Sequence, residues 1–255
     1  MSLGCIRLRH VDKSFADRRG LPAICALANI CLDIAPRTFV SFVGPSGCGK
    51  STLLRIIAGL TPPSAGQAIV GDREVTGPRR DVGMMFQTPV LFPWRTVLEN
   101  VLLPLEIFGT DRSAYLERAR GLLFLVGLGD RLHAYPNELS GGMQQRVALA
   151  RVLATQPSII LMDEPFGALD EFTREKLNLE LLRIWQERNQ TVVLVTHSIV
   201  EAVFLSDEVV VMGTQPGRIL ASINVSLPRP RHTAQMKLPE FAALTFSIRE
   251  QLGLD

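Results

Sequence analysis

The sequence shows no marked excess of either charge. It holds 27 basic and 25 acidic residues, which gives a net charge of +2. Proteins that bind nucleic acid without sequence preference present a strongly basic face, so the composition does not support that function. The four cysteines, Cys5, Cys25, Cys31 and Cys48, do not form the C-x-x-C pairs of a metal site. We therefore expect reduced thiols in a cytosolic protein.

Long apolar runs are also missing. None approaches the roughly 18 residues of a transmembrane helix, and the opening MSLGCIRLRHVDKSF lacks the apolar stretch of a signal peptide. Apolar residues nevertheless make up 47% of the 255 residues, which is ample for a core and argues against disorder. We expect a soluble chain, able to dock onto a membrane protein, with one large domain or two small ones.

What the sequence does contain is an alternation of short apolar runs and helical patterns. The runs FVSFVG (39–44), SIILMDEP (158–165), TVVLVTH (191–197) and DEVVVMG (207–213) predict buried strands. The helical patterns KSTLLRIIAGL, TREKLNLELLRIWQER and IVEAVFLS lie near or between them. Strands and helices in this order favour an α/β fold with a mostly parallel sheet.

Other parts of the sequence depart from this rhythm. The first forty residues and AIVGDREV suggest short antiparallel strands, and the pattern from about Pro89 to Glu138 is helical. We expect a single domain over residues 1–255, in which a helical subdomain of about residues 89–150 is inserted in the α/β core. Several prolines follow Gly213, so the tail of about residues 214–255 is expected to be irregular.

The segment GPSGCGKST fits the phosphate-loop pattern G-x-x-x-x-G-K-[ST], and it lies between a predicted strand and a predicted helix. Backbone N–H groups of such a loop bind phosphate oxygens. We expect Lys50 to reach the β- and γ-phosphates and Ser51 to bind Mg²⁺. A simple glycine-rich turn is the weaker alternative. The loop consists of Gly44, Pro45, Ser46, Gly47, Cys48, Gly49, Lys50, Ser51 and Thr52.

Polar residues follow the other predicted strands. Asp163 and Glu164 end SIILMDEP, at the sheet edge where ligands of α/β proteins bind. Asp163 suits the coordination of Mg²⁺, and Glu164 can activate a water molecule for in-line attack. His197 ends the third strand, although a lone histidine there is more often structural. Gln87 could ligate Mg²⁺, but an isolated glutamine carries almost no signal.

The stretch LSGGMQQR places two glycines at the start of a strong helix former. Ser140 suits an N-cap, and the helix start presents N–H groups that bind anions. Because the phosphate loop already supplies one such site, Ser140 contacts either the same nucleotide or a nucleotide on another copy. The residues alone leave both possibilities open.

Together these motifs resemble the nucleotide-binding subunit of an ATP-binding cassette (ABC) transporter. LSGGMQQR is similar to the family signature and precedes SIILMDEP, while Gln87 in MMFQ, ALD at 168–170 and His197 in VTH follow the family order. The resemblance covers about residues 5–215. It implies that Phe15 stacks on adenine, that Asp170 crosses a dimer interface and that His197 senses the γ-phosphate.

The resemblance also implies a homodimer. Ser140, Gly141 and Gly142 would bind the γ-phosphate of ATP held by the opposite subunit, with Glu164 as the general base and Gln87 linking Mg²⁺ to the membrane partner. Thr88 and Ser198 depart from the acidic residues that the family often carries at those positions, but neither position carries the chemistry.

Two softer features, VLFPWRTVLENVLLPLEI and the tail segments PGRI and LPRPR, are similar to ATPases of nitrate, sulfonate and taurine importers. That similarity implies two transmembrane permease subunits, an extracytoplasmic solute-binding protein, and a peripheral position on the cytoplasmic face of the inner membrane. Because the tail is short, we do not expect the regulatory domain that some sugar-importer ATPases carry.

The segment PVLFPWRTV is expected to be the docking surface, and the alternative is that Leu91, Phe92 and Trp94 pack inside the helical subdomain. A soluble ABC-type ATPase of DNA repair or translation is the alternative function, but the coiled coils, zinc cysteines or tandem cassettes typical of such proteins are missing. A phosphate-loop kinase would leave LSGGMQQR unexplained.

Overall fold

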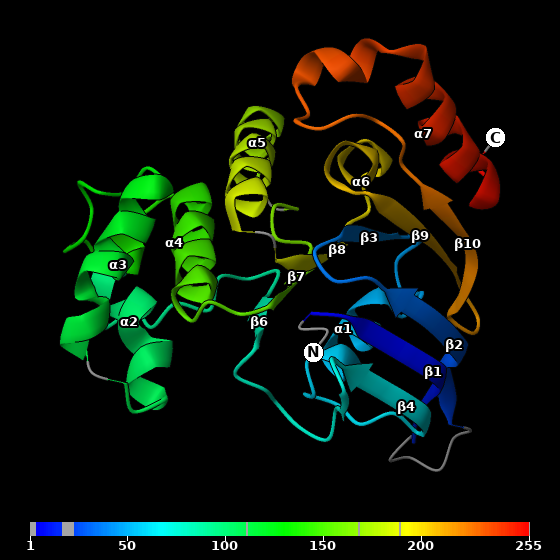
Figure 1. Cartoon of the computed structure of the whole chain (residues 1–255), viewed down its shortest axis with the longest axis horizontal. Coiled ribbons are helices and arrows are strands. Elements are labelled where there is room, and N and C mark those ends of the chain that lie inside the picture. The colour runs from blue at the N-terminus through cyan, green and yellow to red at the C-terminus, as the bar shows by residue number, and fades with distance from the viewer. Residues whose placement is uncertain (1–3, 17–22, 111, 168, 189, 255) are drawn as a thin grey trace. The chain divides into compact units, whose positions relative to one another are not determined.

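The computed structural model describes residues 4–16, 23–110, 112–167, 169–188 and 190–254. The chain falls into two compact units, one formed by Met1–Arg79 with Leu182–Asp255 and the other by Arg80–Leu181. Each unit contains both strands and helices (Figure 1).

An antiparallel sheet opens the first unit. Its order is β2-β1-β4-β5, with β1 at Ile6–Phe15, β2 at Ile24–Ile34, β4 at Ala65–Val70 and β5 at Arg73–Glu74. Strands β1 and β2 are ten and eleven residues long, so the expected antiparallel strands form but are not short. Ile6, Leu8 and Val11 of β1 are fully buried, while neighbouring residues reach solvent.

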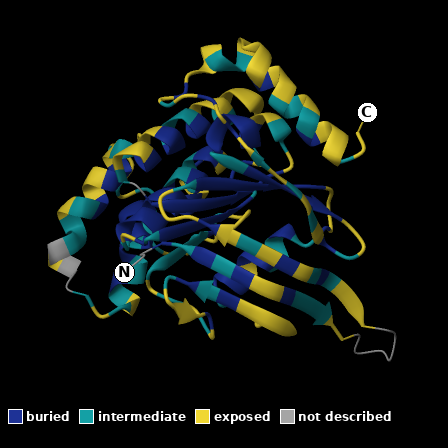
Figure 2. Cartoon of the chain, turned by 45° about the vertical axis from the view of Figure 1, so that its right-hand side comes forward, coloured by how far each residue is buried: buried dark blue, intermediate teal, exposed yellow. Residues whose placement is uncertain are grey.

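A second set of strands in this unit runs in the order β10-β9-β3-β8. Strand β3 (Phe39–Val43) pairs in parallel with β8 (Thr191–Val195) and with β9 (Glu208–Gly213). Every residue of β3 and β8 is buried, as expected where helices cover both faces of a parallel sheet. Figure 2 shows these central strands in dark blue, whereas exposed residues recur along the antiparallel sheet.

The tail differs from the expected irregular segment. Strand β10 (Arg218–Asn224) pairs antiparallel with β9, and the 3-10 helix η2 (Thr233–Lys237) and α7 (Pro239–Gln251) follow. Proline does not prevent this helix because Pro239 occupies its first position, where the missing N–H has no intrahelical partner. Helices α1 (Lys50–Ile57) and α6 (Ile199–Leu205) complete the unit.

The second unit combines helices with a parallel strand pair. Helices α2 (Val97–Ile107), α3 (Arg112–Leu125) and α4 (Gly141–Ala154) contact one another, as expected for a helical subdomain. Strand β6 (Val82–Met85) pairs with β7 (Ile159–Asp163), and the 3-10 helix η1 (Pro136–Glu138) precedes α4. Helix α5 (Glu171–Arg188) begins in this unit and ends in the other.

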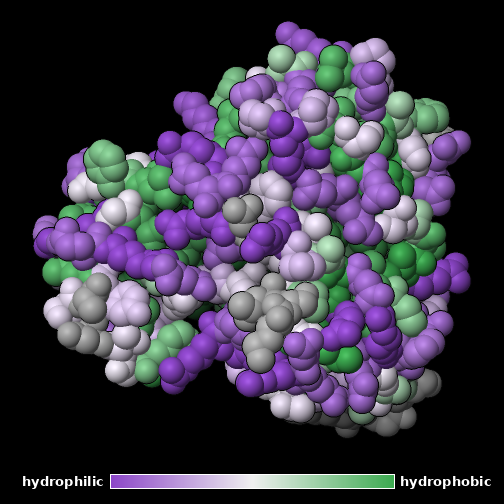
Figure 3. All heavy atoms as spheres, in the orientation of Figure 1, coloured by the Kyte–Doolittle hydropathy of each residue, from purple (hydrophilic) through white to green (hydrophobic). Residues whose placement is uncertain are grey.

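Among the described residues, no helix combines the length and apolar character that crossing a bilayer requires. The face drawn in Figure 3 is mainly hydrophilic, and its hydrophobic side chains form separate groups.

Candidate functional site

The predicted phosphate loop joins β3 to α1, as its sequence context requires. Gly49 is the N-cap of α1 and has a φ of 92°, and a Cβ built there would lie 2.5 Å from Leu27 Cδ2. A Cβ at Gly44 would lie 2.3 Å from the Met212 carbonyl oxygen. Both positions therefore require glycine. The exposed tip at residues 45–47 and the start of α1 offer backbone N–H groups to an anion.

Lys50 is the first residue of α1, and its side chain turns back over the loop. Its Nζ donates to the carbonyl oxygens of Gly44 at 2.7 Å and Pro45 at 2.9 Å. Lys50 is only 6% exposed. The ammonium group is thus held against the backbone of the same loop that is predicted to bind phosphate, where its charge complements an anion. Cys48, beside it, is fully buried.

Phe15, the predicted adenine contact, is the last residue of β1. Its ring is 45% exposed, and Lys13 Nζ lies 5.1 Å from the ring centroid. An exposed aromatic face of this kind can stack on a base.

The end of β7 positions the two predicted carboxylates differently. Asp163 is the last strand residue and is 7% exposed. Glu164 is half-buried and adopts a left-handed backbone with a φ of 46°. Gln87 Nε2 donates to Glu164 Oε2 at 3.4 Å. The structure therefore brings the predicted base together with Gln87, one of the two predicted Mg²⁺ ligands of this unit. A left-handed backbone costs a non-glycine residue free energy and is often found at functional sites.

The segment that carries Gln87 is fixed by two polar residues of α4. Gln145 Nε2 donates to the Gln87 carbonyl at 2.8 Å, and Arg151 donates to the carbonyls of Pro89 at 2.7 Å and Val90 at 2.8 Å. Burial lowers the pKa of Arg151. Sequence reasoning assigned no role to either residue, because a polar side chain on a helix does not reveal that it will bond the backbone of a distant segment. Gln145 is only 3% exposed.

The following segment is fixed by Asn100 of α2, which is fully buried. Its Oδ1 accepts the Phe92 N–H at 2.8 Å, and its Nδ2 donates to the carbonyls of Phe92, Arg95 and Thr96. The aromatic rings of Phe92 and Trp94 lie 5.0 Å apart and remain on the surface, with Trp94 70% exposed. Val90, 60% exposed, has a φ of 46°, which is strained for a β-branched residue. The aromatic residues thus do not pack inside the unit.

The LSGG segment caps α4 as predicted. Ser140 is the N-cap, and its Oγ accepts the Met143 N–H at 3.3 Å. A Cβ at Gly142 would lie 3.0 Å from Thr173 Cγ2, closer than an ordinary van der Waals contact, so Thr173 would have to shift to admit a larger residue. A Cβ at Gly141 would meet nothing closer than 4.0 Å. Packing in the described part of the chain therefore gives no reason for the glycine at position 141.

Asp170 lies directly before α5 and caps it. Its Oδ1 accepts the Thr173 N–H at 3.0 Å, and the hydroxyl and N–H of Thr173 lower the pKa of Asp170. Asp170 is exposed, as a residue at a dimer interface would be in one copy alone. Ala168 of the ALD motif lies outside the described residues.

His197 does not end a strand, because β8 stops at Val195. The histidine lies in the link to α6, is exposed, and directly precedes Ser198, the N-cap of that helix. Its place between a buried strand and a capped helix fixes the backbone on both sides.

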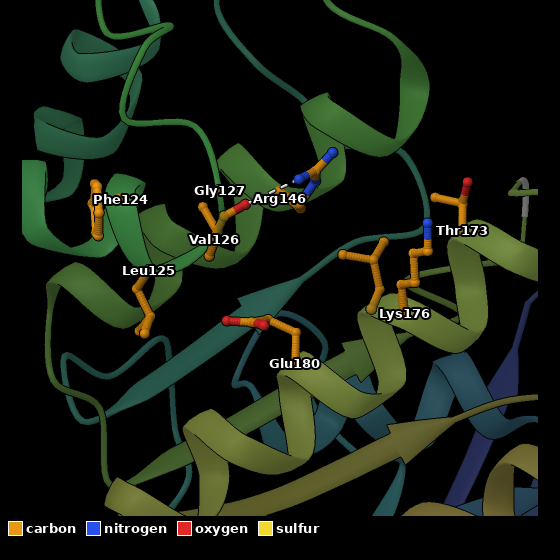
Figure 4. A pocket seen from close by; sticks show the side chains of 9 residues that line it. Phe124, Leu125, Val126, Gly127, Arg146, Thr173, Lys176 and Glu180 are labelled. Atoms are coloured by element: carbon orange, nitrogen blue, oxygen red, sulfur yellow. Dashed lines mark hydrogen bonds between the residues drawn. The ribbon is translucent and has the colours of Figure 1, made fainter. Parts of the chain in front are cut away.

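A cavity of about 330 Å³ lies elsewhere in the second unit, between the end of α3, α4 and α5. In Figure 4 the Arg146 guanidinium points toward the Val126 carbonyl, to which it donates at 3.2 Å. The lining residues do not include those predicted to bind nucleotide.

Comparison with known proteins decides the family. The family model "ABC transporter" matches residues 27–167, which is more than half of the chain. The chain belongs to the ABC transporter family. The predicted α/β phosphate-loop fold is confirmed, and this ABC ATPase binds and hydrolyses ATP.

Several relatives of this ABC ATPase match nearly its whole length. An uncharacterized ABC transporter ATP-binding protein of Methanocaldococcus jannaschii is 51% identical, over 88% of this chain and 84% of its own. A taurine import ATP-binding protein of Rhizobium johnstonii is 45% identical, over 96% and 95%. A nitrate import ATP-binding protein of Synechocystis is 44% identical, over 89% and 85%.

Solved structures of ABC transporter cassettes have the same fold. A dimeric ABC transporter cassette superposes with a TM-score of 0.78 at 37% identity, covering 88% of this chain and 100% of the other. The same cassette in a post-hydrolysis state with ADP and Pi gives a TM-score of 0.76 at 35% identity, with the same coverage.

Proposed function

We propose that this ABC ATPase drives the import of a small anionic solute such as nitrate, a sulfonate or taurine. Relatives named as taurine and nitrate import ATP-binding proteins, at 45% and 44% identity, support this solute class. In this proposal two transmembrane permease subunits receive the work of ATP hydrolysis, and an extracytoplasmic binding protein delivers the solute. The ATPase is peripheral, on the cytoplasmic face of the inner membrane, and the whole chain is one ABC ATPase domain with an inserted helical subdomain.

The observation that carries the hydrolytic part is the hydrogen bond between Gln87 and Glu164. Only the amide nitrogen of Gln87 can donate to a carboxylate, so its Oε1 must face another direction. Glu164 is thereby oriented as the base that activates water, and Gln87 keeps an oxygen ligand for a cation.

The residues proposed to hold Mg²⁺ are Ser51, Gln87 and Asp163. A hydroxyl, an amide oxygen and a carboxylate are the oxygen donors that this ion prefers, so the donor set fits. Held by these residues, Mg²⁺ would supply positive charge that offsets the charge developing on the phosphate. Lys50 and the loop N–H groups bind the phosphates, Phe15 stacks on adenine, and His197 contacts the γ-phosphate.

We propose further that the active form is a homodimer with ATP between two copies. The open space at Gly141 supports this, since a close approach from outside the chain explains a glycine that internal packing does not. The Oγ of Ser140 accepts one backbone N–H and can still donate its proton to a phosphate oxygen. Asp170 would then lie at the interface between the copies.

The test is Glu164→Gln, which keeps the size and polarity of the side chain but removes the base. We expect ATP binding to persist, turnover to fall roughly 10²- to 10⁴-fold, and an ATP-dependent dimer to accumulate in size-exclusion chromatography. Glu175→Gln, an exposed change on α5, is the matched control and should behave as wild type. A Glu164→Gln variant that still hydrolyses ATP, or stays monomeric with ATP, would contradict the proposal.

A further inference from the structure

The proposed function assigns no role to the tail segment Leu227–Arg231, whose sequence is LPRPR. It follows β10 and runs across the end of α6, as the orange trace above α6 shows in Figure 1. Arg231 is 3% exposed, an unusual degree of burial for an arginine. The two arginines of this segment are aimed at the backbone of α6.

Arg231 satisfies carbonyl groups at the C-terminal end of α6. Its Nη1 donates to the carbonyls of Val203 at 3.1 Å, Phe204 at 3.0 Å and Ser206 at 2.6 Å. The last carbonyls of a helix have no intrahelical partner, and a cation is stabilised by the helix dipole at this end. Burial and, to a smaller extent, the charge of Arg229 lower the pKa of Arg231 to about 10. The group therefore remains charged at neutral pH.

Arg229 completes the contact. Its Nη2 donates to the Leu205 carbonyl at 2.8 Å, so the carbonyls from residue 203 to residue 206 all accept from these two arginines. Its Nε donates to Asp207 Oδ1 at 2.8 Å, and its guanidinium lies 4.2 Å from the ring centroid of Trp185. Asp207 in turn accepts the Phe39 N–H at 2.9 Å, at the start of β3. The tail segment is thus bonded to the end of α6 and, through Asp207, to β3.

The opposite end of α6 is fixed to the link that carries His197. Ser198 Oγ accepts the Glu201 N–H at 3.2 Å, and Thr196 Oγ1 accepts the Ser198 N–H at 3.0 Å. The Thr196 hydroxyl also donates to the Glu201 carboxylate, which is 7% exposed. Helix α6 has seven residues, or about 10 Å of length. A helix this short moves as one piece, so a displacement of its C-terminal end displaces the residue before its N-cap.

We propose that Arg231, assisted by Arg229, is a positioning residue for ATP hydrolysis. By holding the C-terminal end of α6 it sets where His197 stands. This inference rests on the proposed role of His197 at the γ-phosphate. In this proposal the LPRPR segment contributes to ATP hydrolysis by positioning His197 through α6.

The experiment is a double-mutant cycle on the full chain, with steady-state ATPase and nucleotide binding as readouts. Arg231→Ala should lower kcat roughly 10- to 100-fold, the scale of a misplaced catalytic group, while KM for ATP changes little. Arg231→Lys, which keeps a charge and three donors, should restore most of the loss. In a His197→Ala background, Arg231→Ala should have no further effect, since its target is already gone. Arg249→Ala, a tail arginine bonded to the Leu254 carbonyl, is the matched control and should match wild type.

A second readout keeps the inference testable if Arg231→Ala folds poorly. Arg229→Ala should give the same kinetic pattern at smaller size. The chain has only four histidines, so the imidazole resonances can be assigned by substitution. The His197 signal should move in Arg229→Ala and stay unchanged in Arg249→Ala.

The turnover of the two single variants distinguishes a failure of the proposed His197 role from a failure of the Arg231 role. If His197→Ala retains wild-type turnover, the proposed role of His197 is wrong. If His197→Ala loses turnover but Arg231→Ala does not, or if the two losses add, the positioning role of Arg231 is overturned while the proposed function stands.

Discussion

The side-chain amide of Gln87 donates to the carboxylate of Glu164 across 3.4 Å, although 77 positions separate them in the sequence. The bond depends on two independent supports. Gln145 fixes the backbone of Gln87, and the left-handed turn after β7 aims Glu164.

Gln87→Glu tests this relationship. The substitution keeps an oxygen ligand but removes the donor and sets a second carboxylate beside Glu164, where like charges repel. We expect turnover to fall roughly tenfold or more while ATP binding persists in a filter or fluorescence assay. Thr88→Glu adds the same charge one position away and should be nearly silent; equal losses in both variants would show that charge alone is responsible.

Gly141→Ala separates folding from assembly. The nearest atom to the added methyl within the chain is 4.0 Å away, so unfolding by urea should show equal or higher stability, by up to about 1 kcal/mol. Turnover should nevertheless fall, roughly 10²-fold, because the methyl would meet the γ-phosphate held by the second copy. Gly142→Ala should not show the same gain in stability, because its added methyl meets Thr173 in the same chain.

The control for Gly141→Ala is Gly121→Ala, inside α3, where an added Cβ also meets nothing within 4 Å. It should gain about 0.5–1 kcal/mol of stability with normal turnover. Normal turnover in Gly141→Ala as well would remove the structural argument for the two-copy site.

Trp94→Asp tests the docking surface. Trp94 is 70% exposed and its ring lies 5.0 Å from that of Phe92, and a buried interface tryptophan contributes about 2 kcal/mol or more to binding. ATP binding by the chain should be unchanged, whereas solute uptake by reconstituted vesicles should be lost. Phe124→Asp, at a residue that is 79% exposed on α3, provides the comparison, and unchanged uptake in Trp94→Asp would refute the docking role.

Asn100→Leu tests how that surface is held. The substitution leaves the N–H of Phe92 and three carbonyls without their side-chain partner. The carbonyls of Phe92 and Thr96 keep backbone donors, but the Phe92 N–H and the Arg95 carbonyl lose the Asn100 side chain, at about 1 kcal/mol for each lost bond, so the urea midpoint should fall. Asn137→Leu, at an exposed residue of η1, should change stability by less than about 0.5 kcal/mol. Similar midpoints for both variants would mean that Asn100 is dispensable.

Local patterns in the sequence were sufficient for most of the fold. The runs that became β3, β7, β8 and β9 are continuous apolar stretches bounded by turns, so their burial could be expected. Strand β10 alternates between exposed and half-buried residues at a sheet edge, and β6 has only four residues. Neither strand gives a strong apolar signal. The prolines of the tail predicted an irregular segment, whereas α7 begins at a proline.

In the site, too, some features follow from local sequence and others do not. The phosphate loop and the LSGG cap are local motifs, so their backbone form follows from adjacent residues. The supports by Gln145, Asn100 and Arg231 depend on contacts between distant segments. A polar side chain in the sequence does not reveal whether it will bond a remote carbonyl, because the tertiary fold decides that.

The left-handed backbone of Glu164 has a consequence for the evolution of this chain. Glycine adopts a φ of 46° without the steric cost that a side chain brings. Screening variants for heat resistance alone should therefore enrich Glu164→Gly, a change that removes the proposed base. At this position the backbone conformation favours glycine, whereas the proposed base requires a carboxylate.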